Sequence, residues 1–151
     1  MTTGRLKDAC HWEDGNHPGP LDTVDGLVAA LSEQQGWAEV TAPSAISIDG
    51  YVGKTFQRTA PTDMSDCSTR TYGMRTGEPG VNSDFRSWEN PDEPAGWAGF
   101  YYEPGWIETL WVLDLDGTMV VISTGVLPEP SAGADADFVA DVLDSIRIER
   151  P

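Results

Sequence analysis

The chain has 151 residues, the size of one domain, and its hydrophobic fraction of 39% includes six tryptophans, enough apolar mass for a core. Its 25 acidic residues against 9 basic ones give a formal net charge of −16. This charge argues against nucleic acid and anionic membrane surfaces as partners, because both are bound through clustered Lys and Arg. No run approaches the ~18 apolar residues of a membrane-spanning helix, and residues 1–7 lack the apolar core of a signal peptide. The chain is therefore either cytoplasmic or follows a leader or an upstream segment.

The first twenty residues predict an irregular segment. They are polar and end in a His-Pro-Gly-Pro sequence, and proline disfavours regular structure there. We expect residues 1–20 to lie across the surface and residues 21–151 to form a single domain.

An amphipathic helix is predicted next. Asp22 or Thr23 can cap its N-terminus by accepting a backbone hydrogen bond, and Gly36 is expected to end it. Its apolar side chains follow the i, i+3, i+4, i+7 spacing of one helix face: Val24, Leu27, Val28 and Leu31.

Strands are predicted in the middle of the chain. Residues 45–48 and 52–59 flank an Asp-Gly turn signal, and residues 68–75 form a weaker strand. Residues 76–96 are rich in turn formers and read as the longest irregular stretch. One side of the alternation in 52–59 holds Val52, Lys54, Phe56 and Arg58.

The last third of the chain has the strongest β signal. Residues 97–102 predict an aromatic strand, and residues 107–115 and 118–124 predict a hairpin around a second Asp-Gly turn. Both arms of this hairpin are apolar on both faces, so we expect them in the middle of a sheet that a helix covers on at least one side.

A second amphipathic helix closes the chain, beginning at Ser131 or Asp135. Its apolar stripe is Phe138, Val139, Val142, Leu143 and Ile146. The order helix, five or six antiparallel strands, helix predicts an α+β fold with an antiparallel sheet flanked by an N-terminal and a C-terminal helix.

The two cysteines, Cys10 and Cys67, lie in polar, turn-like contexts. This setting favours a disulfide over two buried thiols or a metal-binding or reactive pair. In the chain-entropy model a bridge closing so long a loop contributes about 4 kcal/mol. A disulfide implies an extracytoplasmic protein, and it would tie segment 1–20 to the domain.

Two motifs could support catalysis. Asp114-Leu115-Asp116-Gly117-Thr118 matches the signature of haloacid-dehalogenase-like phosphatases, which implies a nucleophilic Asp114, an acid–base Asp116 and Mg²⁺. No lysine follows Thr118 and too few residues remain for such a site, so a hairpin turn explains the motif better.

The segment 10–17 holds both histidines of the chain, and His11, Glu13 and His17 could supply three zinc ligands. Nothing in the pattern fixes these ligands in place, and we expect a polar loop without a metal. We expect no cofactor elsewhere in the chain.

An aromatic cluster is the best candidate binding site. Aromatic side chains alternate with Gly and Pro between residues 88 and 106, and such a region can line a groove for an apolar ligand, a glycan or a peptide. An alternative is that these rings pack into the core. The candidate ligand-binding residues are Trp88, Trp97, Tyr101, Tyr102 and Trp106.

Several segments in a fixed order resemble a domain family of secreted actinobacterial proteins and lipoproteins of unknown function. They are 8–12, 23–31, 48–54, 66–67, 110–118 and 143–146. The resemblance implies a Mog1/PsbP-like (LpqN-like) architecture, a pairing of the two cysteines and an Asp-Gly hairpin without catalysis. Proteins of this architecture are mostly binding or assembly modules.

We therefore expect a non-catalytic extracytoplasmic binding or sensory module whose partner is a small molecule, a glycan or an envelope protein. The alternative is a metal-dependent hydrolase or phosphatase using the acidic or histidine motif. A third class, a structural partner of an envelope protein, predicts an exposed apolar patch or sheet edge and no pocket.

Overall fold

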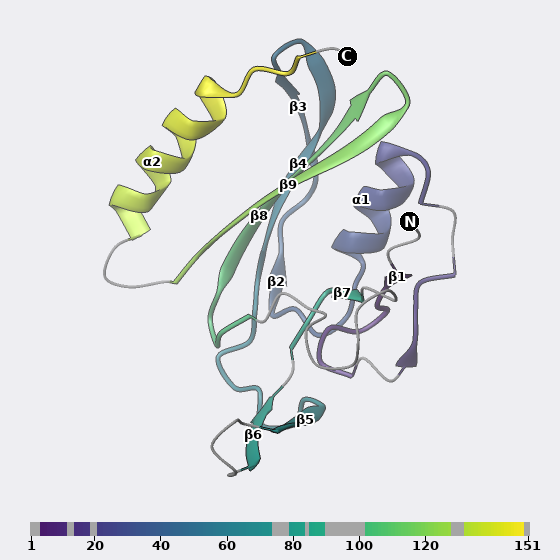
Figure 1. The fold of residues 1–151 in the computed structure, drawn as a ribbon, viewed down its shortest axis with the longest axis vertical. Helices are drawn as coiled ribbons and strands as arrows, with labels where there is room; N and C mark the ends of the chain where they lie inside the picture. Colours follow the sequence, from purple (N-terminus) through teal and green to yellow (C-terminus); the bar gives the residue numbers. More distant parts are fainter. Residues whose placement is uncertain are drawn as a thin grey trace.

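The computed structural model describes residues 4–11, 14–18, 21–73, 79–83, 85–89, 102–127 and 132–149. It confirms a small α+β domain, in which a five-stranded antiparallel sheet is accompanied by one N-terminal and one C-terminal helix (Figure 1). The elements are β1 (Gly4–Arg5), α1 (Val24–Ser32), β2 (Glu39–Val40), β3 (Ser44–Ile48), β4 (Tyr51–Thr59), β5 (Thr69–Gly73), β6 (Pro79–Ser83), β7 (Trp88–Glu89), β8 (Ile107–Leu115), β9 (Thr118–Val126) and α2 (Ala132–Ser145).

The main sheet has β4 and β8 at its centre. Strand β4 pairs with β8 on one side and with both β2 and β3 on the other, and β9 follows β8. The predicted hairpin 107–115/118–124 is confirmed, with β9 two residues longer than expected. The prediction that both arms lie mid-sheet is wrong for the second arm, because β9 pairs within the described residues with β8 alone and forms an edge.

Both Asp-Gly turns are confirmed as tight hairpin turns. Asp49 and Gly50 have φ of 48° and 85°, and Asp116 and Gly117 have φ of 53° and 92°. Two successive positive φ values define the type I′ turn, whose twist matches that of the flanking strands.

Helix α1 packs on one face of the sheet. Thr23 caps it by accepting a hydrogen bond from the Gly26 N–H at 3.0 Å. The helix ends at Glu33 rather than at Gly36, which lies in a later turn (φ 91°) against the Cys10 backbone, where any Cβ would collide. The α1-face cluster consists of Leu27, Val28, Leu31, Phe56, Leu110 and Val112.

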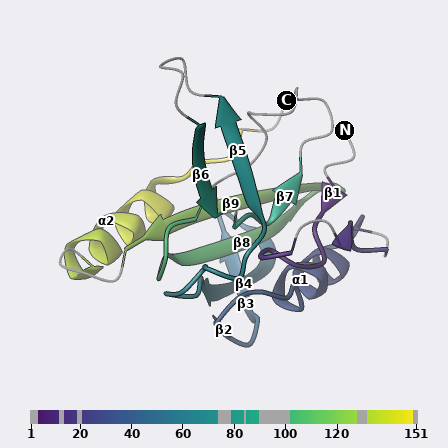
Figure 2. The same ribbon diagram turned by 90° about the horizontal axis from the view of Figure 1, so that it is seen from below.

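Helix α2 packs on the opposite face, so the sheet lies between the two helices (Figures 1 and 2). The α2-face cluster has Ile48, Trp111 and Leu113 at its centre, with Val139, Leu143 and Ile146 from α2 and its C-terminal extension packed against it. The predicted stripe was too wide: Phe138 remains 68% exposed and Val142 43% exposed.

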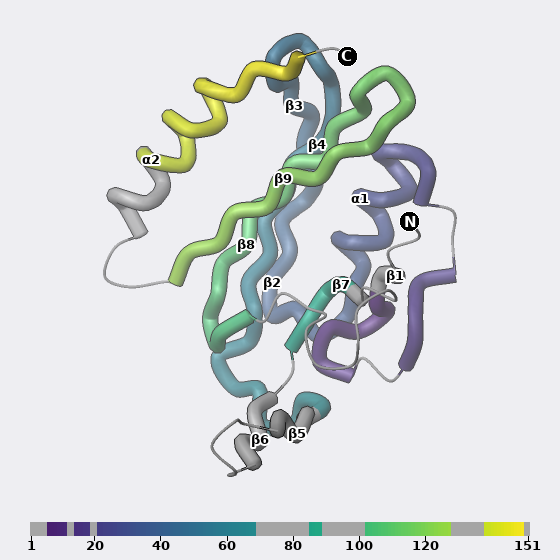
Figure 3. The backbone as a smooth tube through the Cα atoms, in the orientation of Figure 1, coloured from purple at the N-terminus to yellow at the C-terminus, as the bar shows by residue number. Residues whose placement is uncertain are grey.

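The N-terminal segment departs from the expected surface position. Strand β1 pairs with β7, and Leu6 and Ala9 are 2% and 0% exposed. The tube in Figure 3 shows the coloured part of this segment near β7 and the lower end of α1. Long-range pairing, which a local pattern does not contain, accounts for the difference.

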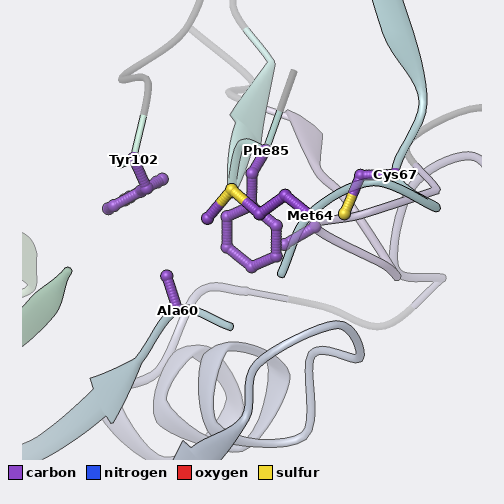
Figure 4. Packing of buried hydrophobic residues seen from close by; sticks show 6 residues of the cluster. Ala60, Met64, Cys67, Phe85 and Tyr102 are labelled. Atoms are coloured by element: carbon purple, nitrogen blue, oxygen red, sulfur yellow. The ribbon is translucent and has the colours of Figure 1, made fainter. Parts of the chain in front are cut away.

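A disulfide between Cys10 and Cys67, with Cα atoms 4.5 Å apart, confirms the predicted pairing of the two cysteines. It joins the N-terminal segment to the loop after β4. The sulfurs lie beside a third set of apolar residues, the disulfide cluster: Ala9, Ala60, Met64, Cys67, Phe85 and Tyr102 (Figure 4).

The stretch predicted to be irregular, 76–96, contains two strands. Strand β6 pairs with β5 in a ribbon that extends away from the main sheet, and β7 pairs with β1 (Figures 1 and 2). The aromatic strand predicted for 97–102 lies outside the described residues except for Tyr102, which is in no strand.

Candidate functional site

A buried ion pair lies on the α1 side of the sheet. Arg58 of β4 and Glu108 of β8 are directly opposite each other in the register, and the Arg58 Nε donates to Glu108 Oε2 at 2.6 Å. The two side chains are only 0% and 3% exposed. Burying both charges is tolerable only when their remaining polar atoms are also bonded.

The other nitrogens of Arg58 are bonded to three further residues. Nη1 donates to Gln34 Oε1 at 2.9 Å and to the Leu31 carbonyl at 3.3 Å, and Nη2 donates to Ser87 Oγ at 2.7 Å. The Gln34 amide in turn donates to the carbonyls of Leu6 and Ser87. One guanidinium therefore links β4 to the end of α1, and through Gln34 and Ser87 to the N-terminal segment and the residues before β7.

An aromatic ring stacks on this guanidinium, and two further rings pack against the first. Arg58 Cζ lies 4.0 Å from the centre of the Trp37 ring, a cation–π contact. Trp37 also meets Phe85 and Tyr102 edge-to-face, each at 5.0 Å between ring centres, and its indole N–H donates to Gln34. The ring planes of Trp37, Phe85 and Tyr102 are thus fixed by packing and by a hydrogen bond.

The second carboxylate oxygen of Glu108 faces two hydroxyls. Tyr102 donates to Oε1 at 3.0 Å and Ser123 of β9 at 2.6 Å. Burial, with the neighbouring Glu108 carboxylate as the second cause, raises the pKa of Tyr102 to about 12. Tyr102 therefore stays a neutral donor at physiological pH, and Glu108 accepts three side-chain hydrogen bonds.

Above this polar floor lies a cavity of about 460 Å³, within the ~300–1,000 Å³ range of small-ligand pockets. Most of its lining is aromatic or aliphatic. The floor carries Glu108 and the hydroxyls of Tyr102 and Ser123. The lining residues in the described part of the chain are Trp88, Tyr102, Trp106, Glu108, Val121, Ser123 and Gly125.

A glycine makes room for one side of the cavity. A Cβ at Gly125 would occupy the position of the Trp106 indole, which lies directly on the β9 backbone there. The indole ring of Trp106 also packs against the disulfide cluster, which limits its movement. Trp106 therefore forms a stable side of the cavity, and only glycine at position 125 permits this.

The structure brings together three of the five candidate aromatic residues. Trp88 and Trp106 are half-buried and Tyr102 is buried, and all three line the cavity. Trp97 and Tyr101 lie outside the described residues. Trp111, which follows this aromatic region in the sequence, is buried on the opposite face of the sheet.

The acidic motif serves the hairpin turn. The Asp114 carboxylate accepts the Gly117 N–H at 2.6 Å, and Asp116 adopts the positive φ that the turn requires. Both side chains are exposed. This geometry agrees with the interpretation of the motif as a turn.

The histidine motif is not assembled in the described residues. His11 is exposed and lies 3.4 Å from the Asp8 carboxylate, whose hydrogen bond raises the pKa of the imidazole. Glu13 lies outside the described residues, and His17 is half-buried. No group of three or more potential metal ligands occurs where the chain is described.

The sequence analysis missed Arg58 and Glu108, the residues on which the floor depends. A usable signal was present. Arg58 shares the face of Phe56, and Glu108 shares the face of Leu110 and Val112, so each charge lies in phase with buried residues. On each strand the charged residue occupies the same alternating positions as the buried apolar residues. Once the two strands are aligned, opposite charges at such positions indicate a buried pair.

No family model, curated protein or solved structure matches this chain. Neither described helix has the length and apolar character to cross a bilayer.

Proposed function

We propose that this protein is a non-catalytic binding module that takes an apolar or aromatic group of its ligand into the cavity beside Trp88 and Trp106. The single observation behind this proposal is the combination of an aromatic lining with a floor whose polar groups are already bonded to one another. Such a site offers contact area and shape and leaves no activated nucleophile or base.

The polar floor favours rigidity. Every hydrogen bond to Glu108 comes from a different segment: β4, β9 and the residue Tyr102 before β8. A floor fixed at three points holds the cavity open before a ligand arrives, and preorganisation reduces the entropy lost on binding.

We also propose that the protein is extracytoplasmic and that it is related to the secreted actinobacterial domains that it resembles. The Cys10–Cys67 disulfide supports both, because disulfides persist in oxidising compartments. The location is testable by the redox state of the two cysteines in protein isolated from its native source.

Tryptophan fluorescence tests the binding proposal. Trp88 and Trp106 lie at the cavity, so we expect emission changes on titration with n-alkyl alcohols and phenyl-bearing alcohols as probes. Val121→Phe places a ring in the cavity and should weaken binding at least about tenfold, since the probe loses contact volume.

The matched control is Val120→Phe, one residue away on the same strand and pointing to the opposite face. It should leave the affinity within about twofold of the parent protein. Equal losses in both variants, or no emission change with any probe, would contradict the proposal.

A further inference from the structure

The outer edge of β9 is long, and no described residue pairs with it. Its nine residues, Thr118–Val126, include no charged residue and no proline. Among the described residues, β9 has a sheet partner on one side only, and no backbone hydrogen bond joins it to a segment outside the hairpin. Natural proteins usually blunt such an edge with charge, proline or a short strand, because it readily pairs with another chain.

The opposite edge of the sheet shows this usual protection. There β4 is covered by two short strands, β2 and β3, of two and five residues. The contrast singles out β9 as the edge that remains available for pairing.

The register decides which backbone groups of β9 point outward. In an antiparallel pair, residues alternate between those bonded to the partner strand and those directed away from it. Leu115 and Thr118 close the two-residue turn and form a bonded pair, so every second residue from Met119 onward presents its N–H and C=O outward. The outward residues are Met119, Val121, Ser123 and Gly125.

Three of these outward residues also line the cavity: Val121, Ser123 and Gly125. A residue of an incoming strand that bonds to one of them places its side chain on the same face of the sheet. The same partner residue can therefore pair with the edge and direct its side chain toward Trp88 and Trp106.

We propose that the ligand is an extended peptide segment of a partner protein, which adds to β9 as an antiparallel strand and inserts one apolar side chain into the cavity. This inference rests on the proposed function and names its ligand class. Main-chain hydrogen bonds would supply affinity and the cavity would supply specificity, the division of roles typical of strand addition.

Charge complementarity selects this partner over a second copy of the chain. Two copies would each bring a net charge of −16, whereas a peptide with flanking lysines is attracted. The exposed Asp114 and Asp116 lie at the hairpin tip, where the C-terminal end of an antiparallel strand would arrive. The partner segment is therefore apolar at every second position and basic at its ends.

The test uses the full chain and a synthetic peptide, Lys-Thr-Val-Thr-Phe-Thr-Val-Thr-Lys, labelled for fluorescence anisotropy. With Phe in the cavity, the Phe and Val amides point toward β9 and the Thr amides point away. A peptide N-methylated at Phe and Val should bind at least about tenfold weaker, because its donors are lost, whereas one methylated at Thr should bind within about threefold of the parent.

Amide exchange measured by NMR gives the second readout. We expect binding to slow exchange at the outward amides of Val121 and Ser123, while the neighbouring inward amides of Val120 and Ile122 stay as protected as before. A merely side-chain-mediated contact would not produce this alternating pattern.

The outcomes separate the two proposals. If both methylated peptides bind like the parent, or if the alcohol probes bind and no peptide does, strand addition is overturned and the cavity function stands. If neither peptides nor alcohols bind, both proposals fail. If sedimentation shows a concentration-dependent dimer that protects the same amides without peptide, the second copy is the occupant and the peptide proposal is wrong.

Discussion

The two faces of the central sheet are built on different principles. On the α1 side, the apolar cluster ends at the Arg58–Glu108 pair, and the network continues into the N-terminal segment and the residues before β7. On the α2 side, Val139 and Leu143 are the described side chains of the helix that pack against the apolar cluster, and Phe138 and Val142 remain exposed.

The two faces differ in how precisely they fix the arrangement of their segments, as well as in what stabilises them. Apolar packing tolerates small rotations of a helix, whereas a network of directional bonds fixes several segments in one arrangement. The cavity lies on the face with the network. We infer that the rigid face serves recognition and the α2 face mainly completes the core.

Glu108→Gln should cause the largest loss of stability, because it acts on the network of the α1 side. It leaves the Arg58 guanidinium buried without a counter-charge, and losing one partner of a buried pair costs up to ~5 kcal/mol. Urea denaturation at neutral pH measures the free energy of unfolding. The control is Asp25→Asn, which removes the exposed pair with Lys54 and should cost under ~1 kcal/mol. Similar losses in the two variants would show that the buried network is not stabilising.

The double variant Cys10→Ala/Cys67→Ala should destabilise the fold by about 4 kcal/mol, since the bridge closes a loop over a separation of 57 residues. Urea denaturation of the variant beside the parent protein gives this loss. We also expect a change in tryptophan emission, because Trp37 and Trp106 pack against the disulfide cluster. An unchanged midpoint would mean that the N-terminal segment is held by its other contacts alone.

Two leucine truncations compare how tightly the two helices pack on the sheet. Leu31 in α1 is fully buried, and Leu143 in α2 is half-buried. Leu31→Ala should therefore cost about 2 kcal/mol more than Leu143→Ala, because it leaves the larger cavity. Thermal and urea unfolding of the two variants measures these losses. A larger loss for Leu143→Ala would refute the description of α2 as the more loosely attached helix.

The smallest expected effect is a pH dependence at Tyr102. Its pKa of about 12 in the folded chain lies above the ordinary tyrosine value of 10.0, so folding favours the neutral phenol. The corresponding stabilisation is complete below about pH 10 and is lost as the pH rises toward about 12. Tyr102→Phe should show a flatter decline of unfolding free energy across this window than the parent protein, and parallel curves would contradict the assignment.

Elements with strong local patterns were predictable from the sequence. The spacing of Leu27, Val28 and Leu31 predicted α1, and the two Asp-Gly signals predicted both hairpins, because these patterns reflect interactions between near neighbours. Strands β1 and β7 were not predictable in this way. Each has two residues, and they pair across more than eighty positions of the chain, so no local window contains their signal.

The candidate site, like the fold, was predictable only in part. Aromatic composition pointed to Trp88, Tyr102 and Trp106, and these residues do line one cavity. Arg58 and Glu108 were missed because charged residues in alternating strands are normally taken as the solvent side. Their burial follows from the alignment of β4 with β8, which is a property of the assembled sheet.

The position of the disulfide has a consequence for the timing of activity. Cys67 is in the same cluster as Tyr102, and Trp106 packs against that cluster. A chain in which Cys10 and Cys67 are still reduced would therefore hold Tyr102 and Trp106 less firmly in place than the oxidised chain. Under the proposed function, oxidation of the two thiols would therefore precede binding.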